Sequence, residues 1–151
     1  MKALATVIVA WAIAGAAQAQ AQDWVIGGAG GTVAQAYDQG RIYSQGNIRS
    51  TWVLTVFRET QRDGNFDYVI ARMSFDCDSN RFSSESNMTY RIGVDEPISE
   101  PDYSGRWFEV PQGTVMSSMT DSICADVRQE SLGADQPHVL AESMREYMAG
   151  Q

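Results

Sequence analysis

The sequence predicts an α+β domain: an antiparallel meander of β-strands with a helix tied to one of its faces by a disulfide, plus a C-terminal helix. Three observations indicate this fold. Segments rich in β-branched and aromatic residues alternate with Gly, Asn and Asp turns through the first two thirds of the chain. Two apolar stripes with helical spacing come after them. One cysteine, Cys77, lies in the strand region, and the other, Cys124, lies beside the first helical stripe.

Residues 1–19 have the pattern of a secretory signal peptide. Lys2 gives a positive start, an apolar run follows, and small residues end it, so cleavage is expected after Ala19 or, as the alternative, after Ala21. The apolar run is shorter than the roughly 20 residues of a membrane span, and no cysteine follows it that could carry a lipid. We therefore expect a periplasmic or secreted protein with no membrane anchor after signal removal.

The composition of the mature part, about 130 residues, suits one acidic domain. It contains ten arginines and no lysine against nineteen acidic residues, and the whole chain has a net charge of −8. Nucleic acid and anionic membrane surfaces attract basic patches, so neither is an expected partner.

The predicted strands follow one another along the chain with turns between them. An Asp-Gly pair in the loop 61–65 favours a hairpin between the two longest strands. The glycine run 27–31 is expected to break the first strand. The predicted strands are 22–26, 32–37, 48–58, 66–77, 81–92 and 107–110.

Alternation of side chains indicates which strand faces are buried. In the segment 81–92, polar residues alternate with apolar ones that we expect on one core face: Phe82, Met88, Tyr90 and Ile92. In the segment 66–77, Cys77 has the same parity as four apolar residues: Val69, Ala71, Met73 and Phe75. Cys77 is therefore expected on a buried apolar face.

The second cysteine is expected on a helix that packs against that face. Thr114 is a candidate N-cap, and an apolar stripe recurs after it at Val115, Met119, Ile123 and Val127. An even pair of cysteines in a small exported domain is most simply one disulfide, so we expect Cys77 to be bonded to Cys124. For a loop of about 48 residues the chain-entropy treatment gives about 4 kcal/mol of stabilisation.

A second helix is expected at 139–148. Its apolar stripe is Leu140, Met144, Tyr147 and Met148, and Glu142, Arg145 and Glu146 are expected to lie away from it. The long strands are apolar on parts of both faces, and one helix covers only one face. We expect the tail helix to dock on the second face, or on the rim near Trp52 and Tyr68; a partner or another copy of the chain are the alternatives.

Four features resemble chemical sites, and each is better explained as structure. The glycine run 27–31 lacks the Lys-Ser/Thr pair and the following helix of a phosphate loop. Residues 76–80 resemble the start of a calcium loop, but Arg81 stands where glycine is needed. A catalytic histidine would have to lie beside a serine and be oriented by an acid, whereas His138 follows Pro137 at the expected start of the last helix, where surface capping or no role is expected. The acidic loop 95–102 is expected to be solvated. We therefore expect no catalytic residue, no metal site and no cofactor.

The motifs also resemble a known family in their order. They are Trp24, Tyr37-Asp38, IRSTWVLTVF, SFDCDSNRF, Tyr90 and GRWFEVPQGTVMSSMTDSIC, which ends at Cys124. In this order they resemble the surface-adhesin protein E family of bacterial envelope proteins, over about 23–124. The resemblance implies an antiparallel sheet with a disulfide-tied helix, and binding of host matrix and serum proteins. It divides the chain into the signal peptide 1–19, a domain at 22–127 and a C-terminal extension at 128–151 that is expected to form one helix.

Three functional hypotheses follow. The first is a non-enzymatic exported module that binds an unidentified protein partner, with a homodimer as a further candidate assembly. The second is a small exported hydrolase with an acidic cleft, for which the sequence offers no positioned histidine or close carboxyl pair. The third is an envelope-stability factor with a bacterial partner.

Overall fold

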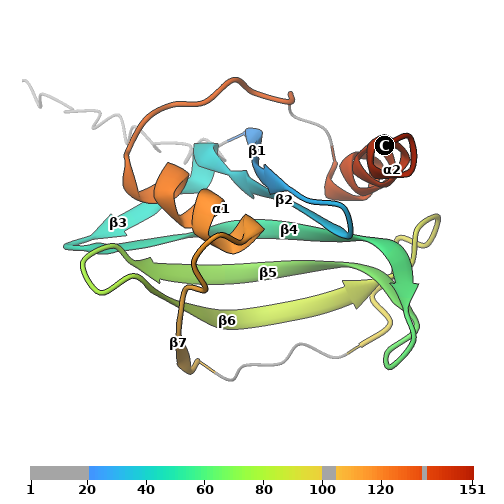
Figure 1. Ribbon diagram of the computed structural model, residues 1–151, viewed down its shortest axis with the longest axis horizontal. Helices are drawn as coiled ribbons and strands as arrows, with labels where there is room; N and C mark the ends of the chain where they lie inside the picture. The colour runs from blue at the N-terminus through green and yellow to red at the C-terminus, as the bar shows by residue number, and fades with distance from the viewer. Residues whose placement is uncertain (1–20, 100–104, 134–135) are drawn as a thin grey trace, which may run out of the picture.

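In the computed structural model (Figure 1), one antiparallel sheet carries two helices. The structure describes residues 21–99, 105–133 and 136–151, so the signal peptide 1–19 and residues 100–102 of the acidic loop lie outside the described residues. The strands are β1 (Trp24–Ala29), β2 (Val33–Asp38), β3 (Tyr43–Gln45), β4 (Ile48–Gln61), β5 (Phe66–Asp76), β6 (Arg81–Tyr90) and β7 (Trp107–Glu109). The helices are α1 (Val115–Cys124) and α2 (Pro137–Ala149), and a 3-10 turn covers Gln39–Arg41.

The sheet is the predicted meander. Its strand order is β1-β2-β4-β5-β6-β7, every pair is antiparallel, and β3 pairs with the first residues of β4. The sequence analysis missed β3, because Tyr43–Gln45 is only three residues long and lies between turn residues. The long β4–β5 hairpin forms the centre, with Val53 opposite Ala71 and Leu54 opposite Ile70.

Helix α1 covers one face of the sheet, as predicted. Thr114 is its N-cap: the Thr114 hydroxyl accepts a hydrogen bond from the Ser117 N–H, and the Ser117 hydroxyl accepts one from the Thr114 N–H. Met119 and Ile123 of α1 are fully buried in a cluster with strand residues of one parity: Val25, Tyr37, Val53, Ala71, Met73 and Phe75. The disulfide Cys77–Cys124 joins α1 to the β5 end of this face, with a Cα–Cα distance of 5.6 Å.

Helix α2 packs on the opposite face, which confirms the predicted docking of the tail. Its buried residues Leu140, Ala141, Met144 and Met148 lie in a second cluster. The strands contribute residues of the other parity to this cluster: Leu54, Val56, Tyr68, Ile70 and Tyr90, with Trp24, Ala34 and Ala36 from β1 and β2. Because successive residues of a strand point to opposite faces, Val53 and Leu54 belong to different clusters.

The part of this second face beyond α2 is polar, which explains why it needs no covering helix. Ser50 lies opposite Ser74, and Ser74 lies opposite Ser83. The hydroxyls of Ser50 and Ser74 are 2.6 Å apart, Ser74 also donates to Glu85, and Glu85 pairs with Arg72 at 3.2 Å. These side chains satisfy one another, so the short hydroxyls are buried without an unpaired group.

A bulge in β6 contradicts the expectation that its apolar residues share one face. Phe82 packs in the α1 cluster, whereas Tyr90 packs in the α2 cluster. The register with β5 shifts between Arg72 and Met73, so that Glu85 is an extra residue in β6. One extra residue reverses the side-chain parity beyond it.

The glycine run does not break the first strand, which is a second correction. β1 continues through Gly27 and Gly28 to Ala29, with a register shift between Ile26 and Gly28. A Cβ built on Gly27 would lie 2.5 Å from Cγ of Met119. Glycine there allows α1 to approach the strand closely.

In both helices, the residues that are buried differ in part from the predicted apolar stripe. Val127 lies beyond α1 and is 60% exposed, since the helix ends at Cys124. On α2, Tyr147 is 63% exposed, and Ala141 is buried although it was not assigned to the stripe. A buried alanine is only weakly apolar, so a sequence pattern does not reveal its burial. A large apolar residue at the border of a stripe is assigned to the buried face although it is exposed.

Candidate functional site

The residues that could carry chemistry are dispersed over the described parts of the chain. Within these parts there is no group of three or more His, Cys, Asp or Glu side chains that could hold a metal ion. The Asp76 carboxylate accepts hydrogen bonds from the Ser79 hydroxyl, the backbone of the same turn and the Asn47 amide, which lower its pKa. Residues 76–80 are thus a hydrogen-bonded hairpin turn between β5 and β6. The residues 95–98 of the acidic loop are exposed.

His138 has a packing role at the start of α2. Its Nδ1 forms a hydrogen bond of 2.5 Å with the Tyr68 hydroxyl, and its ring packs edge-on against Tyr68 and Tyr90. The two tyrosine rings are stacked, with centroids 5.1 Å apart. Burial raises the pKa of Tyr68, and nearby charges raise it further, so the phenol stays protonated. This histidine anchors the first turn of α2 to the sheet.

A buried carboxylate anchors the later turns of α2. Asp67 Oδ1 pairs with Arg145 Nη1 at 2.6 Å and accepts a hydrogen bond from the Thr60 hydroxyl, also at 2.6 Å. Burial alone would raise the pKa of Asp67, but hydrogen bonds from Thr60, the Ile92 N–H and Arg145 outweigh it and lower the pKa. Arg145 is not a member of the apolar α2 cluster, as expected from its place off the stripe, yet it contacts the sheet. Its long side chain reaches back to β5 and donates to the Arg58 carbonyl on the way.

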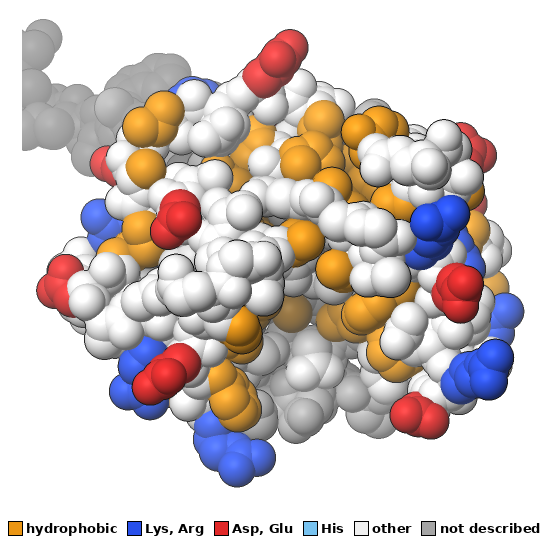
Figure 2. Space-filling model, viewed as in Figure 1, with side chains coloured by type: hydrophobic (Ala, Val, Ile, Leu, Met, Phe, Trp, Pro, Cys, Tyr) orange, Lys and Arg blue, Asp and Glu red, His pale blue; other side chains and the backbone are white. Residues whose placement is uncertain are grey.

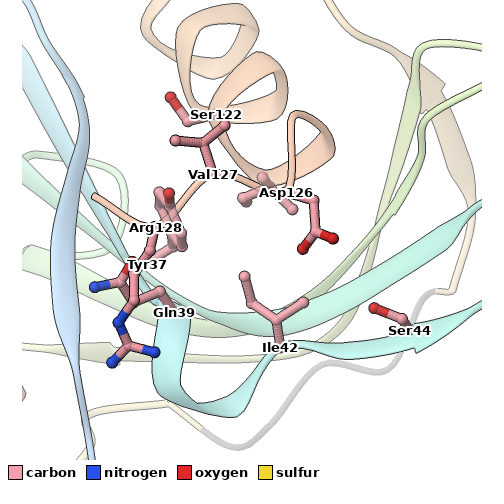
Figure 3. A pocket seen from close by; sticks show the side chains of 9 residues that line it. Tyr37, Gln39, Ile42, Ser44, Ser122, Asp126, Val127 and Arg128 are labelled. Atoms are coloured by element: carbon pink, nitrogen blue, oxygen red, sulfur yellow. The ribbon is translucent and has the colours of Figure 1, made fainter.

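One pocket lies where the C-terminal end of α1 meets the chain after β2 (Figure 3). It has a volume of about 220 Å³, and its walls include Tyr37, Gln39, Ile42, Ser44, Asp126 and Arg128. The polar groups on one side are paired within the chain: Arg128 binds Asp23 at 2.5 Å, and Gln39 bonds both Asp23 and the backbone of residue 129. These pairs fix the start of the linker between the helices, so the polar groups on this side of the pocket have a structural role.

The more distinctive surface is an apolar groove beside β1. It has a volume of about 250 Å³ and lies between β1, α2 and the linker; its lining residues are Ile26, Ala29, Ala34, Leu132, Leu140, Ser143, Met144 and Tyr147. None of these side chains is charged. Ile26, Leu132 and Tyr147 are exposed large hydrophobic residues, and Figure 2 shows hydrophobic side chains gathered over β1 between the two helices. Surface apolar residues grouped in this way mark interaction sites more often than scattered ones do.

Comparison with known proteins identifies the family. The family description "Surface-adhesin protein E" matches residues 24–125. The protein belongs to the surface-adhesin protein E family. No curated protein and no solved structure matches the chain.

The family match extends from β1 to the end of α1 and includes the disulfide, whereas α2 lies beyond it. The described part of this surface-adhesin E protein has no helix of the length and apolarity needed to cross a membrane.

The sequence analysis did not find the groove beside β1. Its residues come from β1, β2, the linker and α2, and only the three-dimensional path of the linker brings them together. A weak signal was present in Leu132, an isolated apolar residue among glycine and polar neighbours, whereas Ile26 follows Trp24 and Val25. Nothing in the spacing of these two residues indicates that they lie near each other.

Proposed function

We propose that the mature protein is a non-enzymatic, exported module that binds another protein at the bacterial cell envelope or outside it. The observation that carries this proposal is the family match over 24–125, which spans the sheet and α1. An adhesin-like role also suits a small acidic domain that presents apolar side chains on one edge.

The arrangement of the titratable side chains favours binding over hydrolysis. A hydrolase needs a histidine or carboxylate placed beside a nucleophile. Here His138 Nδ1 is bonded to the Tyr68 phenol, and the Asp67 carboxylate is bonded to Thr60 and Arg145. Each group has a partner that explains its position without a substrate.

The experiment is a binding assay with the mature, disulfide-bonded protein. The protein is immobilised and exposed to purified extracellular-matrix proteins, purified serum proteins and fractionated envelope proteins of the same bacterium. We expect saturable binding of at least one protein, and no binding when the immobilised domain has been unfolded by reduction and heat. Absence of saturable binding in all three sets would contradict the proposal. Hydrolysis of ester or peptide substrates that disappears in a His138→Ala variant would favour the hydrolase instead.

A further inference from the structure

The path of the linker explains why one sheet edge is partly covered. Because α1 and α2 pack on opposite faces, the chain between them must cross an edge of the sheet. It crosses at β1, over the upper side of the molecule in Figure 1. There the Leu132 N–H donates a hydrogen bond of 2.7 Å to the Trp24 carbonyl. This hydrogen bond ties the linker to the edge at the beginning of β1, although residues 127–133 form no strand.

The rest of the β1 edge, Ile26–Ala29, is a strand that carries the register shift between Ile26 and Gly28. Among the residues that the structure describes, β1 pairs only with β2 in the sheet. In an antiparallel ladder, the backbone groups of alternate residues point to the same side. Since the Trp24 carbonyl points to the outer edge, the N–H and C=O of Ile26 point there as well. The segment Ile26–Ala29 contains no charge and no proline, two features that commonly protect exposed edges, although the register shift between Ile26 and Gly28 interrupts its ladder.

The apolar groove runs beside this same stretch of backbone. Ile26 and Ala29 form its β1 wall, and Tyr147 and Met144 of α2 form the other wall. At about 250 Å³ it is smaller than the roughly 300–1,000 Å³ of small-molecule pockets. Its size and lining suit one or two large apolar side chains better than a polar ligand. Leu132 already presents such a side chain at one end, from a segment that hydrogen-bonds to β1.

We propose that the β1 edge at Ile26–Ala29 is a strand-addition site for a short, extended, uncharged peptide segment of a protein partner, with a large apolar side chain entering the groove. The inference rests on the proposed protein-binding function and assigns it a site. Backbone hydrogen bonds supply affinity in this mode of recognition, and a pocket for alternate side chains supplies specificity.

A second copy of the chain fits this edge less well than a short peptide does. A β1 strand from another copy would bring its own linker and α2, which border the same groove, up to this edge. A peptide of four or five residues brings no such neighbouring elements. The uncharged lining also gives no partner for charged side chains.

The test uses the full mature chain and a defined probe. The probe is a capped peptide that alternates threonine with leucine and phenylalanine and ends in arginine for solubility. The control peptide has proline at its central position and cannot form the strand ladder. We expect the amide NMR signals of residues 24–29 and of Tyr147 to shift with the probe, and not with the control. Slower hydrogen exchange at the Ile26 amide should accompany the shifts.

Variants test the groove and the edge separately. Ile26→Lys places a charge at the edge, and Ala29→Phe fills the groove; each should weaken probe binding at least tenfold. Val139→Lys is the matched control, because Val139 is 53% exposed on α2 and does not line the groove. Its affinity should stay within twofold of the parent. Circular dichroism confirms that each variant is folded, and Ala29→Phe serves as the second variant if Ile26→Lys is not.

Several results would overturn the site. They are an unchanged affinity in Ile26→Lys and Ala29→Phe, shifts that map elsewhere, no binding of the probe at millimolar concentration, or a dimer that Ile26→Lys dissociates. The last result would make a second copy the occupant. The protein-binding assay with Ile26→Lys separates this inference from the proposed function. If Ile26→Lys still binds the protein partner, the proposed site is wrong and the proposed function stands. If the parent binds the probe peptide but no protein partner, the site stands and the proposed function is wrong.

Discussion

Three large apolar side chains, Leu140, Met144 and Met148, pack α2 against the sheet. Met144→Ala tests the contribution of one of them. Met144 is 5% exposed and lies in the cluster with Leu54, Val56 and Tyr68. Truncating a buried methionine to alanine costs about 2–5 kcal/mol, from lost burial and the cavity left behind. A 13-residue helix is marginal in water by itself. We therefore expect α2 to detach far more readily in this variant.

The assay combines denaturant unfolding with hydrogen exchange of the α2 amides. Met144→Ala should lower the free energy of unfolding by about 2–5 kcal/mol, or lower the free energy of local α2 opening by that amount if the helix detaches first. Val139→Ala is the control, since an exposed substitution changes stability by about 0.5 kcal/mol or less. Equal unfolding midpoints and equal α2 exchange in the two variants would refute the packing argument.

Four further predictions address other parts of the structure. Deleting all residues after Gly133 should expose the second sheet face, so dye binding and light scattering should both increase; unchanged values would mean that α2 does not cover that face. Replacing Cys77 and Cys124 with serine should lower stability by about 2–5 kcal/mol, and thiol labelling of the native protein should detect no free cysteine. Asp67→Asn should lower stability by about 1–3 kcal/mol at neutral pH. Because the folded-state pKa of Asp67 is lowered, its contribution is present above about pH 4 and is lost as the pH falls through the folded pKa, so parent and variant should converge in acid. Mass spectrometry of the exported protein should show cleavage after Ala19 or, as the alternative, after Ala21.

Most of the sheet could be predicted from sequence because its signals are local. The alternation in β5 and the Asp-Gly loop before it depend only on neighbouring residues. The pairing of Cys77 with Cys124 followed from parity and from the absence of other cysteines. The N-cap of α1 at Thr114 is likewise a short-range signal.

The features that were missed depend on contacts between distant segments. The extra residue Glu85 in β6 has no sequence signature, yet it moves Phe82 and Tyr90 to different faces. Gly27 resembles a strand breaker until the approach of Met119 is known. The groove beside β1 combines four segments of the chain, and its shape follows from how the linker crosses the edge.

The two helices differ in how they are joined to the sheet, and this difference decides what a protease cut between them would release. α1 is linked covalently through Cys124, whereas α2 depends on packing, His138 and Arg145. A protease that cuts the exposed linker 126–133 would leave α1 in the same fragment as the strands, joined to them by its own backbone and by the disulfide. The same cut would turn α2 into a separate peptide that can diffuse away and uncover a hydrophobic surface. A single proteolytic cut would then expose the apolar sheet face that α2 covers and make the domain prone to association.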